Sequence, residues 1–211
     1  MRRFDTKCMG DVSMVLGMQI TRDREKGTFT ISQAYYTKSV LETCGMGECK
    51  AVYTIGVGPE LSINQGEGDF LSKADTLRYQ SIVGSVMYLA QESRYDILYG
   101  VNQLARAMSN PSKARMGAGK HLLRYLAASI DFNITYSQGG FKLTAFSDAN
   151  WVNNPDNGKS TSPYVMMMCN GPVSFKVGMQ GLTAQSTMEA ELVAAVLAMK
   201  EAIYCAGLMG G

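Results

Sequence analysis

Two acidic side chains stand where a buried structure normally carries apolar ones. Asp148 ends the strand-like run TAFS, and Glu191 lies in the first turns of an otherwise apolar helix expected from Ser186 to about Leu208. Carboxylates brought together from distant segments repel each other unless a cation lies between them. Mg²⁺ prefers such oxygen ligands, and two ions ~4 Å apart can activate water and stabilise the leaving oxygen of a phosphodiester.

Spacing alone leaves the role of these acids open. Asp148 could cap a turn, and Glu191 could be a solvated acid that complements the positive end of the helix dipole. One Asp and one Glu cannot hold two ions without further acids. Glu189 is the alternative to Glu191, since on a helical wheel centred on Leu192 it lies ~60° from the apolar stripe and Glu191 lies ~100° away. Periodicity does not choose between them.

The composition excludes several other chemistries. The chain has 211 residues, 46% hydrophobic and 18% charged, which is typical of a soluble globular protein. A single His and five Cys without zinc-site spacing argue against a His-dependent hydrolase and a structural zinc site. No apolar run looks long enough to cross a bilayer, and the first residues lack the apolar core of a signal peptide. We therefore expect a cytoplasmic or nuclear protein with reduced thiols and no membrane partner, and not a secreted one.

Hydrophobic periodicity predicts the elements that position the acids. Residues 12–20 alternate as one strand, and TFTIS alternates again after a charged turn, which predicts a hairpin. Helices are expected at 33–46, 74–90, 96–108 and 112–127, with a connecting segment over 50–73. Short strands are expected after Asp131 in NITYS, FKLTAFSD, SPYVMMMCN and GPVSFKV, followed by the long closing helix.

A basic stripe lies on the helix expected at 112–127. Lys113, Lys120 and Arg124 follow one another at spacings of seven and four residues, so they share one helical face. Such a stripe could grip a phosphate backbone. Spacing alone favours an ordinary solvated helix face, and the net charge of +2 does not indicate a nucleic-acid binder by itself.

The order of several motifs carries a specific resemblance. FSDANW, NGKSTSPYV and SFKVGMQGLTAQSTMEAELVAA resemble the ribonuclease H region of copia-type LTR retrotransposon Pol polyproteins. VLGMQI with its continuation resembles the primer-grip hairpin and thumb of the reverse transcriptase, with Leu16 and Gly17 in the grip. YQSIVGSVMYLAQESRYDI and NPSKARMGAGKHLLRYL resemble the connection between polymerase and nuclease, so the resemblance covers nearly the whole chain.

The resemblance implies three regions and a truncated α/β fold, α+β overall. Residues 1–72 would form the primer-grip hairpin and thumb-like region, 73–130 the helical connection, and 131–211 the first part of a ribonuclease H-like domain. That domain is expected to be a three-stranded antiparallel sheet with one long helix. The resemblance also selects Glu191 over Glu189 as the partner of Asp148 in binding Mg²⁺ and in catalysis, and it gives the basic stripe weight as a nucleic-acid contact.

Departures from the family pattern limit the expected activity. No two aspartates are adjacent, so the Y-x-D-D hairpin of the polymerase is absent, and the two later nuclease acids are expected beyond Leu208. Pro163 replaces the usual Gly beside a strand. We therefore expect a Pol fragment whose ancestral activity is metal-dependent cleavage of RNA in RNA–DNA hybrids, inactive alone, with the rest of Pol and a hybrid as partners. The alternative is a non-catalytic remnant that at most binds nucleic acid or protein weakly.

Overall fold

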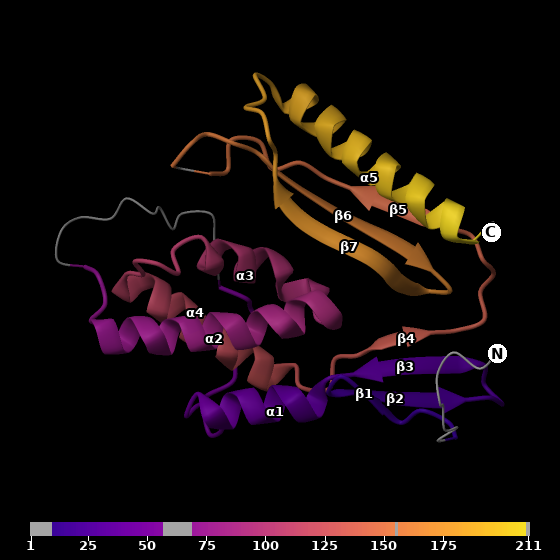
Figure 1. The fold of residues 1–211 in the computed structure, drawn as a ribbon, viewed down its shortest axis with the longest axis horizontal. Helices are drawn as coiled ribbons and strands as arrows, with labels where there is room; N and C mark the ends of the chain where they lie inside the picture. The colour runs from indigo at the N-terminus through magenta and orange to yellow at the C-terminus, as the bar shows by residue number, and fades with distance from the viewer. Residues whose placement is uncertain (1–9, 57–68, 155, 210–211) are drawn as a thin grey trace, which may run out of the picture.

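The computed structural model describes residues 10–56, 69–154 and 156–209, and it confirms an α+β fold (Figure 1). Helices α1 to α4 pack together in one part of the molecule, and two antiparallel sheets lie beside them (Figure 1). The last helix, α5 (Thr187–Met209), lies across one face of the second sheet (Figure 1). This arrangement places the predicted acids at the second sheet, away from the main apolar core.

The first sheet has the order β1-β2-β3-β4, and all its neighbours are antiparallel. Its strands are β1 (Met14–Val15), β2 (Met18–Asp23), β3 (Thr28–Ser32) and β4 (Ile134–Tyr136). The expected hairpin between β2 and β3 is confirmed. The expectation of one continuous strand over 12–20 is wrong, because Leu16 and Gly17, with φ of 49° and 77°, form a two-residue turn between β1 and β2.

The main core lies among the helices. They are α1 (Ala34–Thr43), α2 (Lys73–Glu92), the short 3₁₀ helix η1 (Tyr95–Ile97), α3 (Leu98–Ala105) and α4 (Lys113–Ala128). Their apolar stripes meet in a cluster that includes Ile82, Val86, Leu104, Leu122 and Leu126, all at most 2% exposed. Ser72 and Ser112 cap α2 and α4 by accepting hydrogen bonds from the backbone N–H three residues later.

The second sheet has the order β5-β6-β7, also antiparallel. Its strands are β5 (Thr144–Ser147), β6 (Thr161–Met168) and β7 (Gly171–Met179). Helix α5 packs on this sheet through Ala190, Ala194 and Ala198, whose small side chains allow a close approach. The expected three-stranded antiparallel sheet under one long helix is therefore present.

Two findings differ from simple sequence expectations. The strand β4, which lies in the region 131–211, pairs with β3 of the first sheet and not with β5 to β7. The helix α5 is also long and apolar enough to cross a membrane, by length and composition alone, and only 11% of its most apolar window is buried. The expectation that no apolar run has that length is therefore wrong for α5.

Polar contacts fix the second sheet to the helices and to the first sheet. The Asn102 side chain of α3 donates to the Val177 carbonyl of β7 at 2.9 Å. The Tyr136 hydroxyl of β4 donates to the Pro172 carbonyl at 2.6 Å. Burial raises the pKa of Tyr136, which keeps this hydroxyl protonated as a donor. The Tyr136 ring lies so close to Gly171 that a Cβ there would stand 2.6 Å from it.

Candidate functional site at the end of strand β5

Asp148 directly follows the edge strand β5, as the sequence predicts. Its N–H donates to the Pro163 carbonyl at 3.2 Å, and Asn150 and Thr161 exchange two backbone hydrogen bonds two residues further on. The antiparallel ladder with β6 thus continues past β5, and Asp148 lies opposite Pro163. The side chain of Asp148 is exposed, so it is available to solvent and ligands.

The register sets the face on which Asp148 lies. Directly opposite residues in an antiparallel pair share a face, so Asp148 shares the face of Pro163, and by alternation that of Phe146. This face looks toward η1 and α3 across an apolar cavity of about 240 Å³. The cavity is lined by Asp148 and Ser147 together with aromatic rings from β5, η1 and β7, namely Phe146, Tyr95 and Phe175.

This aromatic cavity was not predicted from the sequence. Tyr95 and Phe175 come from distant segments, and their ring centroids lie 5.4 Å apart in a tilted arrangement. The only local signal is Phe146, which precedes Asp148 by two residues and therefore points to the same side of the strand. The candidate acid is thus bordered by apolar side chains on its own face of the sheet.

Glu191 belongs to the other face of the same sheet. Helix α5 contacts β5 and β6 there, and Tyr164, Ser174 and Glu201 mark the contact. Ser174 donates to the Glu201 carboxylate at 2.6 Å, and burial followed by the charge of Glu201 raises the pKa of Tyr164. Glu191 itself is exposed near the start of α5. The sheet therefore lies between the face that carries Asp148 and the helix that carries Glu191.

The structure separates the roles of the two helix acids. The Glu189 carboxylate accepts a hydrogen bond from the Gln185 N–H at 2.8 Å, and the Glu189 N–H donates to the Ser186 hydroxyl at 3.1 Å. These bonds resemble a capping box in which the Gln185 N–H takes the place of the Ser186 N–H, and they occupy Glu189 at the start of the helix. Glu191 has an exposed carboxylate one turn into α5, which favours it over Glu189 as the candidate ligand.

The acids do not form a metal centre by themselves. Among residues 10–56, 69–154 and 156–209, no group of three or more His, Cys, Asp or Glu side chains is placed to hold a metal ion. Two ions bridging a phosphodiester need more carboxylates than Asp148 and Glu191 supply. The residues in this part of the chain therefore do not fit a complete two-Mg²⁺ site.

The basic stripe is only partly free to bind a ligand. Lys113 and Lys120 are exposed on α4. Arg124 is partly buried, and its Nε donates to the Lys50 carbonyl at 2.6 Å. The Arg124 carbonyl also accepts from the Val52 N–H at 3.2 Å, so this residue holds the segment after α1 against α4. Two of the three predicted basic side chains remain open for contacts.

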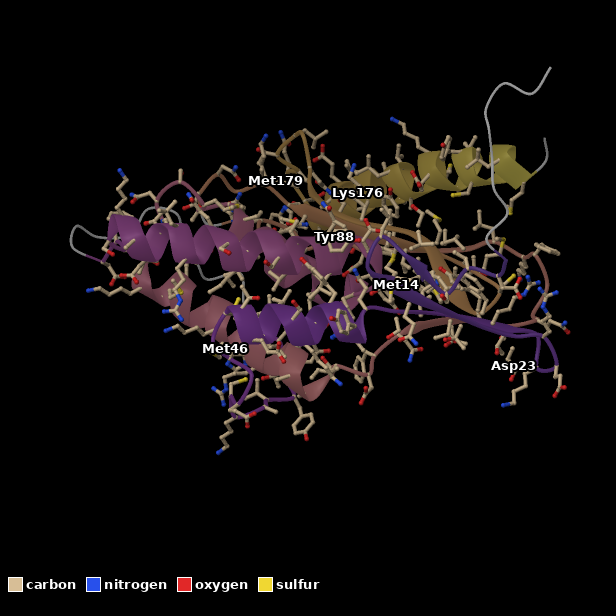
Figure 2. The ribbon with its side chains drawn as sticks, turned by 60° about the horizontal axis from the view of Figure 1, so that its bottom comes forward. Met14, Asp23, Met46, Tyr88, Lys176 and Met179 are labelled. Carbon is tan, nitrogen blue, oxygen red and sulfur yellow. The ribbon has the colours of Figure 1, made fainter. Side chains whose placement is uncertain are left out.

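The primer-grip-like residues lie at the tip of the first hairpin. Leu16 is 77% exposed, and its carbonyl accepts a hydrogen bond from the Tyr88 hydroxyl of α2. Figure 2 shows Tyr88 beside the strand that carries Met14. Val12 and Met14 are also more than half exposed, so the tip presents an apolar surface anchored to α2.

The fold and the site define an α+β protein in which a helical region precedes a sheet carrying one acid at a strand end and another on the covering helix. The chain is 32% identical over 206 residues to the Pol polyprotein of transposon TNT 1-94 from Nicotiana tabacum, covering 96% of this chain and 16% of that protein. It is 33% identical over 192 residues to the Pol polyprotein of transposon RE2 from Arabidopsis thaliana, covering 90% of this chain and 13% of that protein.

A shorter relative matches over most of both chains. The uncharacterized mitochondrial protein AtMg00810 of Arabidopsis thaliana is 30% identical over 200 residues, which are 94% of this chain and 80% of that protein. No family model and no solved structure matches the chain. The chain belongs to the copia-type retrotransposon Pol polyproteins. It spans less than a fifth of the length of the TNT 1-94 and RE2 polyproteins.

Proposed function

We propose that this fragment of Pol contains the first part of a ribonuclease H-like nuclease, whose ancestral activity is metal-dependent cleavage of RNA in RNA–DNA hybrids. The observation that carries the proposal is the placement of the two acids. Asp148 follows the edge strand β5, and Glu191 lies one turn into α5, the helix that packs across the other face of the same three-stranded sheet. The sequence motifs around both acids are the ones that resemble the nuclease region of this family.

The proposal includes the expectation that the chain alone does not cleave a hybrid. Asp148 and Glu191 supply two carboxylates, and the part of the chain that the structure describes brings no third acid to them. Phosphodiester cleavage by two metal ions needs a fuller set of ligands to hold both ions. The missing ligands would come from the remainder of the Pol polyprotein.

A cleavage assay tests this proposal directly. The purified chain is incubated with an end-labelled RNA–DNA hybrid in Mg²⁺ or Mn²⁺, beside Asp148→Asn and the exposed control Glu25→Gln. We expect no hybrid-dependent cleavage from any of the three. Cleavage that Asp148→Asn abolishes and Glu25→Gln leaves intact would show that the chain is active alone. A longer Pol protein carrying both acids should lose cleavage when either Asp148 or Glu191 is replaced, and unchanged activity would refute their role.

A second candidate function is weak, sequence-independent binding of nucleic acid through α4. The exposed Lys113 and Lys120 favour it, since they lie on the same side of one helix. Two phosphate contacts release few counterions. The logarithm of the binding constant should therefore fall with the logarithm of the salt concentration with a slope of about −2. Fluorescence anisotropy with a labelled hybrid measures this slope. Replacing both lysines with Gln should remove this salt dependence. A slope that is unchanged in the double variant would show that the basic stripe does not bind the hybrid.

A further inference from the structure

Helix α5 is apolar on two opposite sides, and the fold uses only one of them. The buried side consists of Ala190, Ala194 and Ala198, which contact the second sheet. At ~100° per residue the opposite side carries a second series of apolar residues, spaced by four, four, three and four positions. We call this series the outer stripe; it consists of Met188, Leu192, Val196, Met199 and Ile203.

The outer stripe is open to solvent. The exposed fractions of its side chains are 81% for Met188, 65% for Leu192, 60% for Met199 and 68% for Ile203. Val196 is 41% exposed. Figure 1 shows α5 at the boundary of the molecule, with the sheet on one side only. A contiguous apolar surface of this kind marks an interaction site.

The packing and the charges of α5 argue against a membrane-spanning role for this helix. The small residues on the other side of α5 lie against the sheet along the helix, and the Glu201 carboxylate accepts a hydrogen bond from Ser174. Glu189, Glu191 and Lys200 add charges within the same helix. Moving α5 across a membrane would break its packing on the sheet and bury these charges at a large cost.

The charges beside the outer stripe are self-complementary. Glu189 and Lys200 are eleven residues apart, which puts them ~20° apart on the helical wheel, on the same flank of the stripe. In an antiparallel pair of identical helices related by a two-fold axis, each flank faces the same flank of the other copy. An axis near position 195 brings Glu189 of one copy beside Lys200 of the other, and brings Leu192 close to Met199.

We propose that the outer stripe of α5 binds the α5 helix of a second copy of this chain, antiparallel, in a two-fold symmetric dimer. The apolar area of the outer stripe is large enough for a dimer of moderate affinity. Five side chains exposing on the order of 100 Å² each supply roughly 500 Å² per partner, and the flanking residues extend this toward the ~800 Å² of a standard interface. Opposite charges at both ends of the stripe fix the antiparallel orientation.

Sedimentation velocity of the whole chain over about 1 to 100 µM tests the proposal. We expect a concentration-dependent dimer, and Leu192→Lys should abolish it. The matched control is Leu77→Lys on α2, because Leu77 is 61% exposed and lies away from α5. A monomer at every concentration, or a dimer that Leu192→Lys leaves unchanged, overturns the proposal.

Charge exchange tests the orientation. Glu189→Lys and Lys200→Glu should each weaken the homodimer about tenfold, because two ion pairs become two like-charge contacts. A one-to-one mixture of the two variants should recover wild-type dimerisation, since every contact in the mixed dimer is again between opposite charges. The mixture also controls for the loss of the Glu189 helix cap. No recovery in the mixture refutes the antiparallel pairing, as does Leu192-dependent binding of a monomer to anionic vesicles.

Discussion

Replacing Arg94 with Met should destabilise the protein through a buried ion pair that the motif SRYDI creates. The Arg94 side chain is 3% exposed and forms two hydrogen bonds with the Asp96 carboxylate, at 2.9 and 2.8 Å. It also donates to the carbonyl and hydroxyl oxygens of Ser129, at 2.9 and 2.7 Å. Its guanidinium lies over the rings of Tyr125 and Phe132, 5.7 and 5.4 Å from their centroids. One side chain thus joins η1 to the end of α4.

The magnitude follows from what Arg94→Met leaves behind. Removing one partner of a buried ion pair costs about 3 to 5 kcal/mol, because the other charge stays buried without compensation. Asp96 is 28% exposed, so water can partly solvate its carboxylate, and the Tyr125 hydroxyl still donates to it at 2.9 Å; we therefore expect a loss near the lower end, about 3 kcal/mol. The pair Arg24–Asp11 is the control, since its side chains are 66% and 84% exposed. Arg24→Met should cost less than about 1 kcal/mol.

Urea denaturation followed by circular dichroism measures both changes as differences in the free energy of unfolding. A double-mutant cycle with Asp96→Asn isolates the Arg94–Asp96 coupling, and we expect more than about 1 kcal/mol of coupling. A loss of stability in Arg94→Met no larger than that in Arg24→Met would refute a stabilising role for the buried ion pair. A double variant without coupling would refute it as well, because the two charges would then act independently.

The remaining predictions concern titration and glycines. Burial, partly offset by Arg115, raises the pKa of Tyr79 from 10.0 to about 12, so unfolding free energy should fall by about 2 to 3 kcal/mol as pH rises from 10 to 12. Tyr79→Phe should reduce that fall, as pH-dependent urea denaturation will show. Gly171→Ala should destabilise by about 1 to 3 kcal/mol, because the Cβ meets the Tyr136 ring. Gly117→Ala should stabilise α4 by about 1 kcal/mol, because nothing lies within 4 Å of the added Cβ; thermal melts compare both variants.

Local patterns predicted where the helices lie, although the one expected at 96–108 is divided into η1 and a shorter α3. They failed where a turn has the same alternation as a strand. The helix expected at 74–90 appears as α2 over Lys73–Glu92, since its apolar residues repeat with helical period and meet the core. Over 12–20 the alternation of Met14, Leu16 and Met18 is the same whether or not the chain turns. Leu16 and Gly17 form a turn because both have positive φ angles. The periodicity of apolar residues does not indicate these angles.

Only the features of the candidate site that lie within one short segment of the sequence could be predicted. Asp148 at a strand end is visible in TAFSD because both the strand and the acid are adjacent in sequence. The face of the sheet on which Asp148 lies depends on the register of β5 with β6. The face on which Glu191 lies depends on where α5 packs. Neither is encoded in one segment. The cavity beside Asp148 needed rings from η1 and β7, which only tertiary structure brings together.

Pro163 links the stability of the sheet to the position of the acid. Asn150 and Thr161 exchange two hydrogen bonds, so the next pair of that kind along the ladder is Asp148 with Pro163. Pro163 accepts from the Asp148 N–H but has no N–H to return to the Asp148 carbonyl. At this position β6 therefore makes one backbone hydrogen bond to the end of β5, whereas a residue other than proline would make two. Because β5 is also an edge strand, the sheet holds the Asp148 backbone from one side only, and by a single hydrogen bond at this position.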